Sequence, residues 1–338
     1  MVHACGTLMR RREFITLISG TAATWPLAAS AQQSGRVRTI GVLMNFLESD
    51  PAGQVGVAAF RDALKKLGWR EGSDLRIELR WAESDPDRLR TFANELVELR
   101  PDAIVGGSTA AIVALARETR TIPIVFATVA DPIGSGFVAS FAHPGGNITG
   151  FAAVDSAMGG KWLELLKEIA PRTGHVALLF NPVTAVPVQF FMSSIQAAAS
   201  SLAVQASAAP VHANDEIEGV IAAQARDPGG GLIVMPDAFN TTNRNLIIGL
   251  AARYGVPASY AQDVFAQSGG LIAYSSVRTE AYEQVAGYVD RILKGEKPAD
   301  LPVQAPTKFE LLINMKTAKA LGIEVPAKLL ALADGVIE

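Results

Sequence analysis

Short apolar runs that end at polar or turn-forming residues recur along this chain and alternate with segments of helical spacing. In the first half the runs occupy residues 37–44, 74–81, 103–106 and 122–127, and helices are expected near 54–67, 86–99 and 109–117. The runs at 103–106 and 122–127 are too short for helices and lack the alternation of a half-exposed strand, which is typical of buried parallel strands. Asp131 and Pro132 predict one further helix start. This order predicts a mostly parallel, doubly wound sheet of successive β-α units.

The same alternation begins again near residue 150. Strands are expected at residues 176–180, 205–211, 232–235, 257–260 and 270–274, with helices at 161–170, 190–202, 215–226, 241–254 and 279–293. A proline-rich segment at 298–306 predicts a linker or crossover, and one last helix is expected near 315–321. Two successive α/β halves predict two lobes with a cleft between them, and the absence of a short repeat argues against a solenoid.

The first 31 residues have the pattern of an export signal. Arg10, Arg11 and Arg12 precede a weakly apolar segment, and small residues around Ala29 to Ala31 offer a cleavage site near Ala31. The arginine pair followed by Glu13-Phe14-Ile15 resembles a twin-arginine signal. An ordinary Sec signal is the alternative, and Met9 is an alternative start. The expected location is the periplasm.

Composition narrows the function classes. The net charge of −3 gives no electrostatic footprint for nucleic acid. The single cysteine, Cys5, lies in the export segment, so the mature chain has no thiol for a disulfide or a thiolate metal site. No run after residue 31 approaches the apolar length of a membrane span.

No pattern of residues supports catalysis, a metal site or a cofactor. Residues 134–139 fit G-x-G-x-x-A, but six residues separate this match from its strand and Pro144 cuts the following helix short, so a dinucleotide site is rejected. His143, His175 and His212 lie near turns or strand ends without the spacing of a catalytic triad or a metal site. We therefore expect neither catalytic nor metal-ligating residues.

Polar and aromatic residues at strand ends support ligand binding instead. Because ligands of open α/β sheets collect at the carboxyl ends of the strands, residues there are candidates for one cleft. The first lobe offers Asn45, Ser108, Thr109, Thr128 and Asp131, and the second offers Asn181, Asp237, Tyr260, Gln262 and Tyr274. Each of these residues alone is also compatible with a cap or a turn. The aromatic residues Phe46, Trp81, Phe239 and Tyr274 are compatible with ligand stacking, although core packing is favoured for each.

Several segments together resemble one protein family. They are RTIGVLM at 38–44, the block IVGGSTAAIVALARETRTIPIVFATVADPIGSGFVASFAHPGGNITG at 104–150, GGLIAYS at 269–275 and YVDRILKGEKPADLPVQAPTKFELLINMKTAKALGI at 288–323. With the export signal, they are similar to ABC-importer substrate-binding proteins of the tryptophan/tyrosine-binding type. The resemblance covers nearly the whole mature chain.

The resemblance implies a type I periplasmic-binding fold, with two Rossmann-like lobes joined by a hinge that the chain crosses three times. The first lobe is then expected at residues 36–150 plus 277–298 and the second at 151–276 plus 299–338. The resemblance also implies that a small solute closes the lobes and that the closed form docks on a membrane permease driven by an ATPase. The protein is expected to be a monomer.

For the ligand, the resemblance implies a small carboxylate-bearing solute such as an amino acid, with aromatic amino acids among the candidates. Ser108 and Thr109 match a carboxylate-binding role, and Asp237, or else Asp131, a role toward an amino group. On this basis Asp237→Ala is expected to weaken binding at least about tenfold while leaving thermal stability nearly unchanged. A periplasmic sensing module that feeds a signalling partner is the alternative function.

Overall fold

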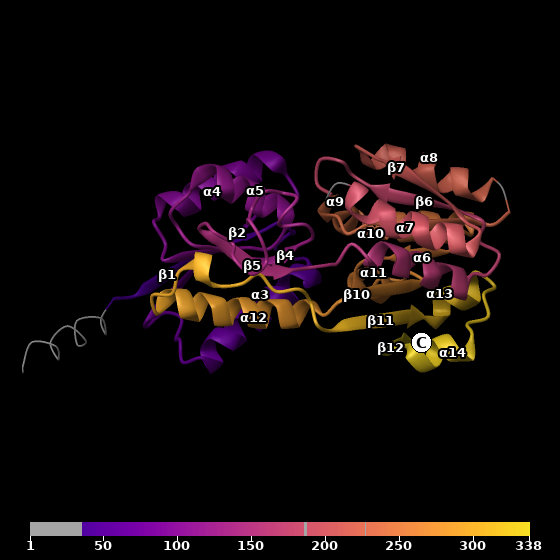
Figure 1. The fold of residues 1–338 in the computed structure, drawn as a ribbon. Coiled ribbons are helices and arrows are strands. Elements are labelled where there is room, and N and C mark those ends of the chain that lie inside the picture. The colour runs from indigo at the N-terminus through magenta and orange to yellow at the C-terminus, as the bar shows by residue number, and fades with distance from the viewer. Residues whose placement is uncertain (1–35, 186–187, 227) are drawn as a thin grey trace, which may run out of the picture.

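The computed structural model describes residues 36–338 except 186–187 and 227, and these residues form two α/β lobes side by side (Figure 1). The first lobe is built on a 5-stranded sheet and the second on a 7-stranded sheet. The predicted fold class, two doubly wound lobes, is confirmed. The expected export segment at residues 1–31 lies outside the described residues.

The first lobe alternates strands and helices along the chain. Its elements are β1 (Arg38–Met44), α3 (Pro51–Lys66), β2 (Leu75–Trp81), α4 (Pro86–Glu98), β3 (Ala103–Gly106), α5 (Thr109–Glu118), β4 (Ile124–Val129) and β5 (Ile148–Ala152). The strands are all parallel in the order β2-β1-β3-β4-β5. The order therefore reverses between β1 and β3, and a ligand crevice is expected outside the carboxyl ends of the strands at this switch point.

Helices cover both faces of the first sheet. One face packs against α3 and against α12 (Arg278–Leu293), a helix from far along the chain, while α4 and α5 cover the other face (Figure 1). Phe60 and Leu64 of α3 are buried on the first face, and Leu96 and Leu115 on the second. Each such side chain stabilises the fold by roughly 1.5–3 kcal/mol, so both helical layers hold the strand ends in fixed positions.

The second lobe repeats this architecture. Its elements are α6 (Met158–Ile169), β6 (His175–Phe180), α7 (Gln189–Leu202), β7 (Gln205–Pro210), α8 (Asn214–Ala225), β8 (Gly230–Val234), α9 (Ala238–Thr242), α10 (Arg244–Tyr254), β9 (Ala258–Tyr260), α11 (Asp263–Gln267) and β10 (Ile272–Ser276). The sheet order is β12-β11-β10-β9-β8-β6-β7, which reverses between β6 and β8. The second switch point thus lies at the ends of β6 and β8.

The C-terminal tail extends the second sheet. It contains β11 (Phe309–Asn314), α13 (Met315–Ala320), α14 (Ala327–Leu332) and β12 (Gly335–Ile337). β11 pairs antiparallel with β10, and β12 pairs parallel with β11. The sequence pattern predicted only one helix here, near 315–321. The missed strand β11 has a run of buried residues, Leu311 to Ile313, and it pairs with a strand that is distant in the sequence.

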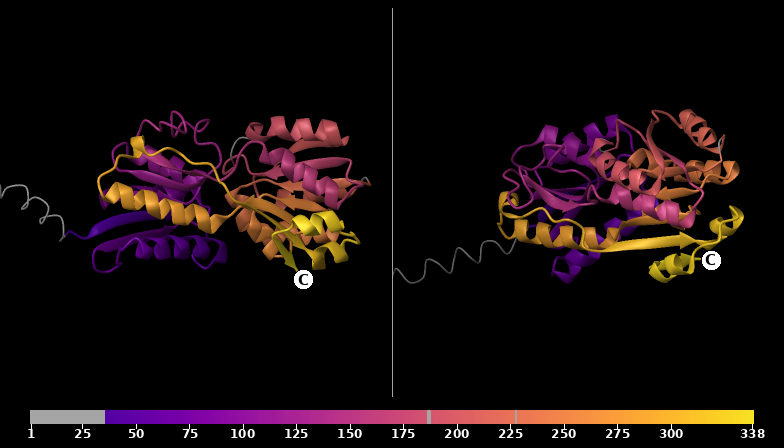
Figure 2. Two further views of the ribbon diagram at one scale, coloured as in Figure 1. Left: turned by 60° about the horizontal axis from the view of Figure 1, so that its bottom comes forward. Right: turned by 45° about the vertical axis from the view of Figure 1, so that its right-hand side comes forward.

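Three connections join the lobes: one after β5, one between β10 and α12, and one before β11. They are tied to each other, because Ser276 Oγ donates to Ala153 O (2.8 Å) and Val277 N donates to Lys308 O (3.2 Å). Figure 2 shows the narrow waist that they form between the lobes. The connections are therefore a coupled hinge.

Two segments differ from the sequence-based expectations. No helix follows Asp131; the chain runs through turns to β5, because Gly136 (φ +72°) and Gly145 (φ +81°) adopt left-handed backbone conformations that helices exclude. The segment 298–304, which contains the short helix η1 (Pro298–Asp300), packs on the first lobe, where Thr149 Oγ1 donates to Leu301 O (2.6 Å). We had expected residues from 299 onward in the second lobe.

Candidate functional site

A cavity lies between the lobes, where residues after β1, β3 and β4 face residues after β8, β9 and β10. Its wall includes these residues expected from the sequence: Asn45, Ser108, Thr109, Thr128, Asp237 and Gln262. It also includes these residues that were not expected: Thr184, Thr241, Asp263, Ser275, Ser276 and Arg278. Both lobes and the hinge therefore contribute to one site.

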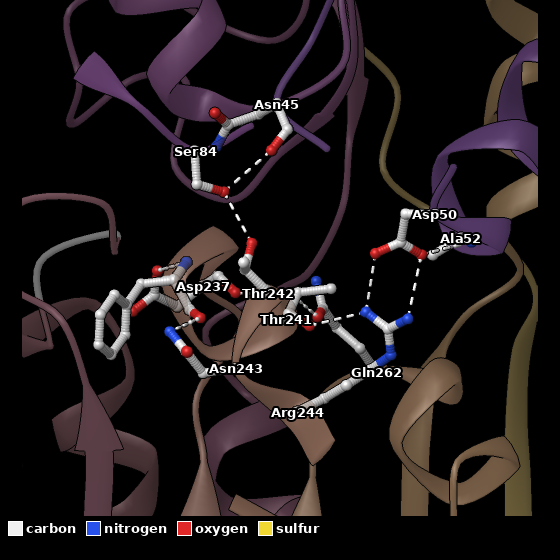
Figure 3. Close-up of polar contacts among 11 residues, drawn as sticks. Asn45, Asp50, Ala52, Ser84, Asp237, Thr241, Thr242, Asn243, Arg244 and Gln262 are labelled. Carbon is white, nitrogen blue, oxygen red and sulfur yellow. Dashed lines mark hydrogen bonds and ion pairs between the residues drawn. The ribbon is translucent and has the colours of Figure 1, made fainter. Parts of the chain in front are cut away.

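Asn45 lines the cavity from the first lobe, and its side-chain amide makes no hydrogen bond to the described residues. It follows β1 directly and is only 1% exposed, yet neither its amide nitrogen nor its amide oxygen has a hydrogen-bond partner among the described residues. Its backbone carbonyl accepts from Ser84 Oγ (2.9 Å; Figure 3), which fixes the backbone at this point. Because an unpaired buried amide costs about 1–3 kcal/mol, a ligand that hydrogen-bonds to this side chain would remove a free-energy penalty.

The start of α5 forms the neighbouring wall. Ser108 caps this helix, with its Oγ accepting from Ala111 N (3.1 Å), so the N–H groups of Thr109 and Ala110 stand at the cavity wall. Thr128 Oγ1 donates to Gly107 O (2.8 Å) and ties this turn to β4. The positive end of the helix dipole and these N–H groups favour an anion.

Gly107 allows the tight approach of this turn to the sheet and to α12. A Cβ atom at position 107 would lie 2.7 Å from Met44 Sδ and 2.8 Å from the Tyr282 hydroxyl oxygen. A larger residue at position 107 would therefore force Met44, Tyr282 or the α5 turn itself to shift.

Asp237 lies in the wall on the second-lobe side, and its carboxylate is already hydrogen-bonded within that lobe. Its carboxylate accepts from Asn181 N (2.6 Å), Thr184 Oγ1 (2.5 Å) and Phe239 N (2.8 Å). Burial raises the pKa of the Asp237 carboxyl to about 6, against the lowering effect of these hydrogen bonds. Thr241 continues the network: its hydroxyl donates to Asp237 O (2.7 Å) and contacts Gln262 Oε1 (Figure 3). These contacts make Asp237 a structural residue of the cavity wall.

The hinge contributes a cation that the sequence analysis missed. Arg278 begins α12, and its side chain is 11% exposed. Its Nη2 lies 3.3 Å from Asp263 Oδ1, and its guanidinium carbon lies 5.6 Å from the centroid of the Phe46 ring. Its buried Nε has no partner among the described residues. No short-range motif marks this arginine, because only the crossing of the chain between the lobes brings it to the cavity.

Four residues expected at the site lie outside the cavity wall. Asp131 accepts from Gly134 N (2.7 Å), and Asn181 accepts from Val183 N (2.8 Å), so both side chains serve their own turns. The Tyr260 ring is buried against Phe265 (4.8 Å between centroids), and the Tyr274 ring stacks on Phe309 (5.6 Å). The geometry therefore agrees with the alternative interpretation of these four residues, as turn or core residues.

Direct contacts between the lobes border the cavity. Arg244 of α10 forms a two-pronged ion pair with Asp50, the N-cap of α3, with Nη1 2.8 Å from Oδ2 and Nη2 3.2 Å from Oδ1. Ser84 Oγ and Thr242 Oγ1 lie 2.9 Å apart (Figure 3). These contacts hold the lobes together, since each joins a residue of one lobe to a residue of the other.

The described ranges contain neither a candidate metal site nor a membrane-spanning helix. Residues 36–185, 188–226 and 228–338 contain no group of three histidine, cysteine, aspartate or glutamate side chains placed to hold a metal ion. No helix in this part of the chain is long and apolar enough to cross a membrane.

Comparisons with known proteins find similar chains that span most of this sequence. The "Tyrosine-binding protein" of Clostridioides difficile (strain R20291) is 26% identical over 303 residues, which are 86% of this chain and 83% of the relative. The structure of the ABC domain in complex with L-Trp from Streptococcus pneumonia matches with a TM-score of 0.82 at 24% identity, over 89% of this chain and 100% of the other. A conserved domain protein from Vibrio cholerae O1 biovar eltor has the same TM-score, 0.82, at 27% identity and the same coverage.

The family model described as ABC transporter substrate binding protein matches residues 40–337, nearly all of the described chain. The resemblance seen in the sequence is thereby confirmed, as is the expectation of a solute-binding protein rather than an enzyme. The chain belongs to the ABC transporter substrate-binding protein family.

Proposed function

We propose that this protein is the receptor of an ABC importer and captures a small carboxylate-bearing amino acid between its lobes. The observation that carries the proposal is the buried Asn45 amide, which faces the cavity between the lobes without a partner among the described residues. Leaving this amide unpaired costs free energy. A ligand that hydrogen-bonds to the amide removes that cost, and the ligand therefore binds more tightly.

An amino acid fits the polar groups of the cavity. The N–H groups at the start of α5 and the hydroxyl groups of Ser108 and Thr109 suit a carboxylate. Support for the amino-acid class comes from relatives named for binding tyrosine and for a complex with L-Trp. Aromatic amino acids are therefore the first candidates, although Phe46 is the one aromatic side chain among the described residues of the wall.

Closure of the lobes is the proposed means of capture. The Asp50–Arg244 ion pair and the Ser84–Thr242 contact require the lobes to be close together, so opening the hinge breaks both. A solute that touches both lobes binds the closed state more tightly than the open state and shifts the population toward it. In the proposed cycle the closed form then docks on a membrane permease that is driven by an ATPase.

The proposed site of action is the periplasm, with the protein exported by the signal at residues 1–31 and cleaved near Ala31. This part of the proposal rests on the sequence pattern of the signal and on the family of the chain. The protein is proposed to act as a monomer.

A thermal-shift screen tests the proposal. The chain from residue 32 onward is heated with each of the twenty common amino acids, with benzoate as a simple aromatic acid and with glucose as a neutral control. A ligand that binds only the folded state raises the melting temperature by mass action. We expect a shift with one amino-acid class and none with glucose. Absence of a shift with every amino acid would contradict the proposed function.

A further inference from the structure

We propose that Arg278 is the carboxylate anchor of this site, with the Asn45 amide as its partner, so that recognition of the solute's acid group takes place at the hinge. This inference rests on the proposed function and deepens it. It assigns the strongest polar contact of the ligand to a residue outside the strand ends, at the point where the chain crosses back into the first lobe.

Arg278 has unused hydrogen-bonding capacity in the right place. A guanidinium carries five N–H donors in a planar fork. Among the described residues, its only hydrogen bond is a long one, from Nη2 to Asp263 Oδ1 at 3.3 Å, while the buried Nε has no partner. Since the side chain lines the cavity, a carboxylate there can accept from the remaining donors.

A comparison with Arg244 argues against a purely structural role. The buried Nε of Arg244 also has no partner among the described residues, so the two arginines differ in their terminal nitrogens. Arg244 uses both of these on Asp50, at 2.8 and 3.2 Å, and Nη1 also donates to Thr241 O (2.9 Å). Two-pronged pairing of this kind is what a structural arginine–carboxylate contact achieves. The single contact between Arg278 and Asp263 fixes the position of the arginine and leaves most of its fork for a second acceptor.

Other features of the cavity favour an anion beside Arg278. The Phe46 ring lies under the guanidinium and orients it, with 5.6 Å between the guanidinium carbon and the ring centroid. The N-terminus of α12, a 16-residue helix, adds the positive end of its dipole to that of α5. The Asn45 amide nitrogen can donate a further hydrogen bond to the acid group.

This arrangement predicts strong discrimination by the acid group. A site built for a carboxylate rejects an analogue that lacks the charge, because the buried donors are then left poorly paired. For a free amino acid and its carboxamide, the affinity difference in the wild-type protein is expected to be about 100-fold. The probes are L-tyrosine with L-tyrosinamide and L-tryptophan with L-tryptophanamide, together with the corresponding pair for any other amino acid that shifts the melting temperature.

Calorimetric titration of each pair into wild type, Arg278→Gln and Arg278→Lys tests the assignment. In Arg278→Gln the acid is expected to bind at least about 10-fold more weakly, and the ratio between acid and amide to fall below about 10. Arg278→Lys is expected to keep part of the ratio, since it keeps the charge but loses the planar fork. Arg253→Gln, an exposed arginine of the second lobe, serves as the control and is expected to behave as wild type.

The ratio between acid and amide is informative even if a variant is less stable, because both ligands are measured on the same protein. An unchanged ratio in Arg278→Gln would overturn the anchor role while leaving the proposed function intact. If wild type binds none of the twenty amino acids, the proposed function itself fails, and this inference fails with it. If wild type binds the amide as well as the acid, only the carboxylate assignment is overturned.

Discussion

Both lobes present polar side chains at the strand ends of their switch points, but the hydrogen bonding of these side chains differs. In the first lobe, Asn45 follows β1, and neither atom of its side-chain amide has a partner among the described residues. In the second lobe, Asp237 lies after β8, the strand that corresponds to β3, and its carboxylate accepts three hydrogen bonds from its own lobe. We therefore expect the first lobe and the hinge to supply most of the polar contacts to a solute, and the second lobe to form a wall that closes over it.

A position at a strand end does not by itself make a residue a ligand-binding residue. What separates Asn45 from Asp237 is the number of neighbours that already satisfy the side chain. A side chain with unmet hydrogen bonds in a buried cavity carries a free-energy penalty that a ligand relieves.

The largest effect is expected from Asp237→Ala, on stability. The change leaves the buried Asn181 N–H and the half-buried Phe239 N–H without their acceptor, so the free energy of unfolding should fall by about 2–4 kcal/mol, measured by chemical denaturation. This revises the sequence-based expectation of nearly unchanged stability. Asp131→Ala, which removes one hydrogen bond in an exposed turn, is the control and should cost about 1 kcal/mol or less. Equal, small losses for both variants would contradict the structural role of Asp237.

The pH dependence of stability gives a second test of Asp237. Its pKa of about 6 in the folded state exceeds that of an exposed aspartate, so the folded state binds this proton more tightly than the unfolded state. Its contribution is therefore fully present below about pH 4 and is lost as the pH rises through about 6, with a size of about 1–3 kcal/mol. Asp237→Asn should lack this contribution. Identical pH profiles of unfolding for wild type and Asp237→Asn would contradict the raised pKa.

Asn45→Ala tests whether the Asn45 amide binds the solute. We expect about 10- to 30-fold weaker binding of the amino acid found in the thermal-shift screen, with stability unchanged or slightly higher, because the substitution removes an unpaired buried amide. Asn181→Ala is the matched control: its amide already bonds Val183 N (2.8 Å) and His212 O (3.4 Å), so it should affect stability more than affinity. Calorimetry and thermal unfolding of both variants decide the matter. The opposite pattern would reverse the roles of the two asparagines.

The smallest effect is expected from loosening the contact between the lobes. Arg244→Gln removes the ion pair to Asp50, so the ligand-free protein should open more often and bind solute about 3- to 5-fold more weakly. Small-angle X-ray scattering should show a larger radius of gyration without ligand. Arg253→Gln, in the same helix but paired with Glu218 on the surface, should change neither quantity. A compact ligand-free Arg244→Gln protein would argue against a role for this ion pair in closure.

The alternating pattern was sufficient to predict the doubly wound lobes, because buried parallel strands and amphipathic helices leave local signals in the sequence. Residues at strand ends such as Asn45, Ser108 and Thr128 were predicted at the site because topology alone brings such ends together. Asp131 and Asn181 met the same criterion but are followed by Pro132 and Pro182, and their side chains bond to their own turns.

Other features depend on contacts between distant segments and leave no local signal. The pairing of β11 with β10 and the position of the segment 298–304 depend on how the hinge folds back. Arg278 reaches the cavity for the same reason. Whether a side chain such as Asp237 is already satisfied also depends on neighbours like Thr184, which lie far away in the sequence. Satisfaction of hydrogen bonds is therefore the property that sequence patterns predict least well.

The proposed binding site is tested most directly by a crystal structure of the protein with the amino acid that binds most tightly in the thermal-shift screen. We predict that the solute lies between the lobes, with its polar atoms within hydrogen-bond distance of the Asn45 amide and its carboxylate against Arg278. A solute bound elsewhere, or one that leaves the Asn45 amide unpaired, would contradict the claim that this cavity is the binding site.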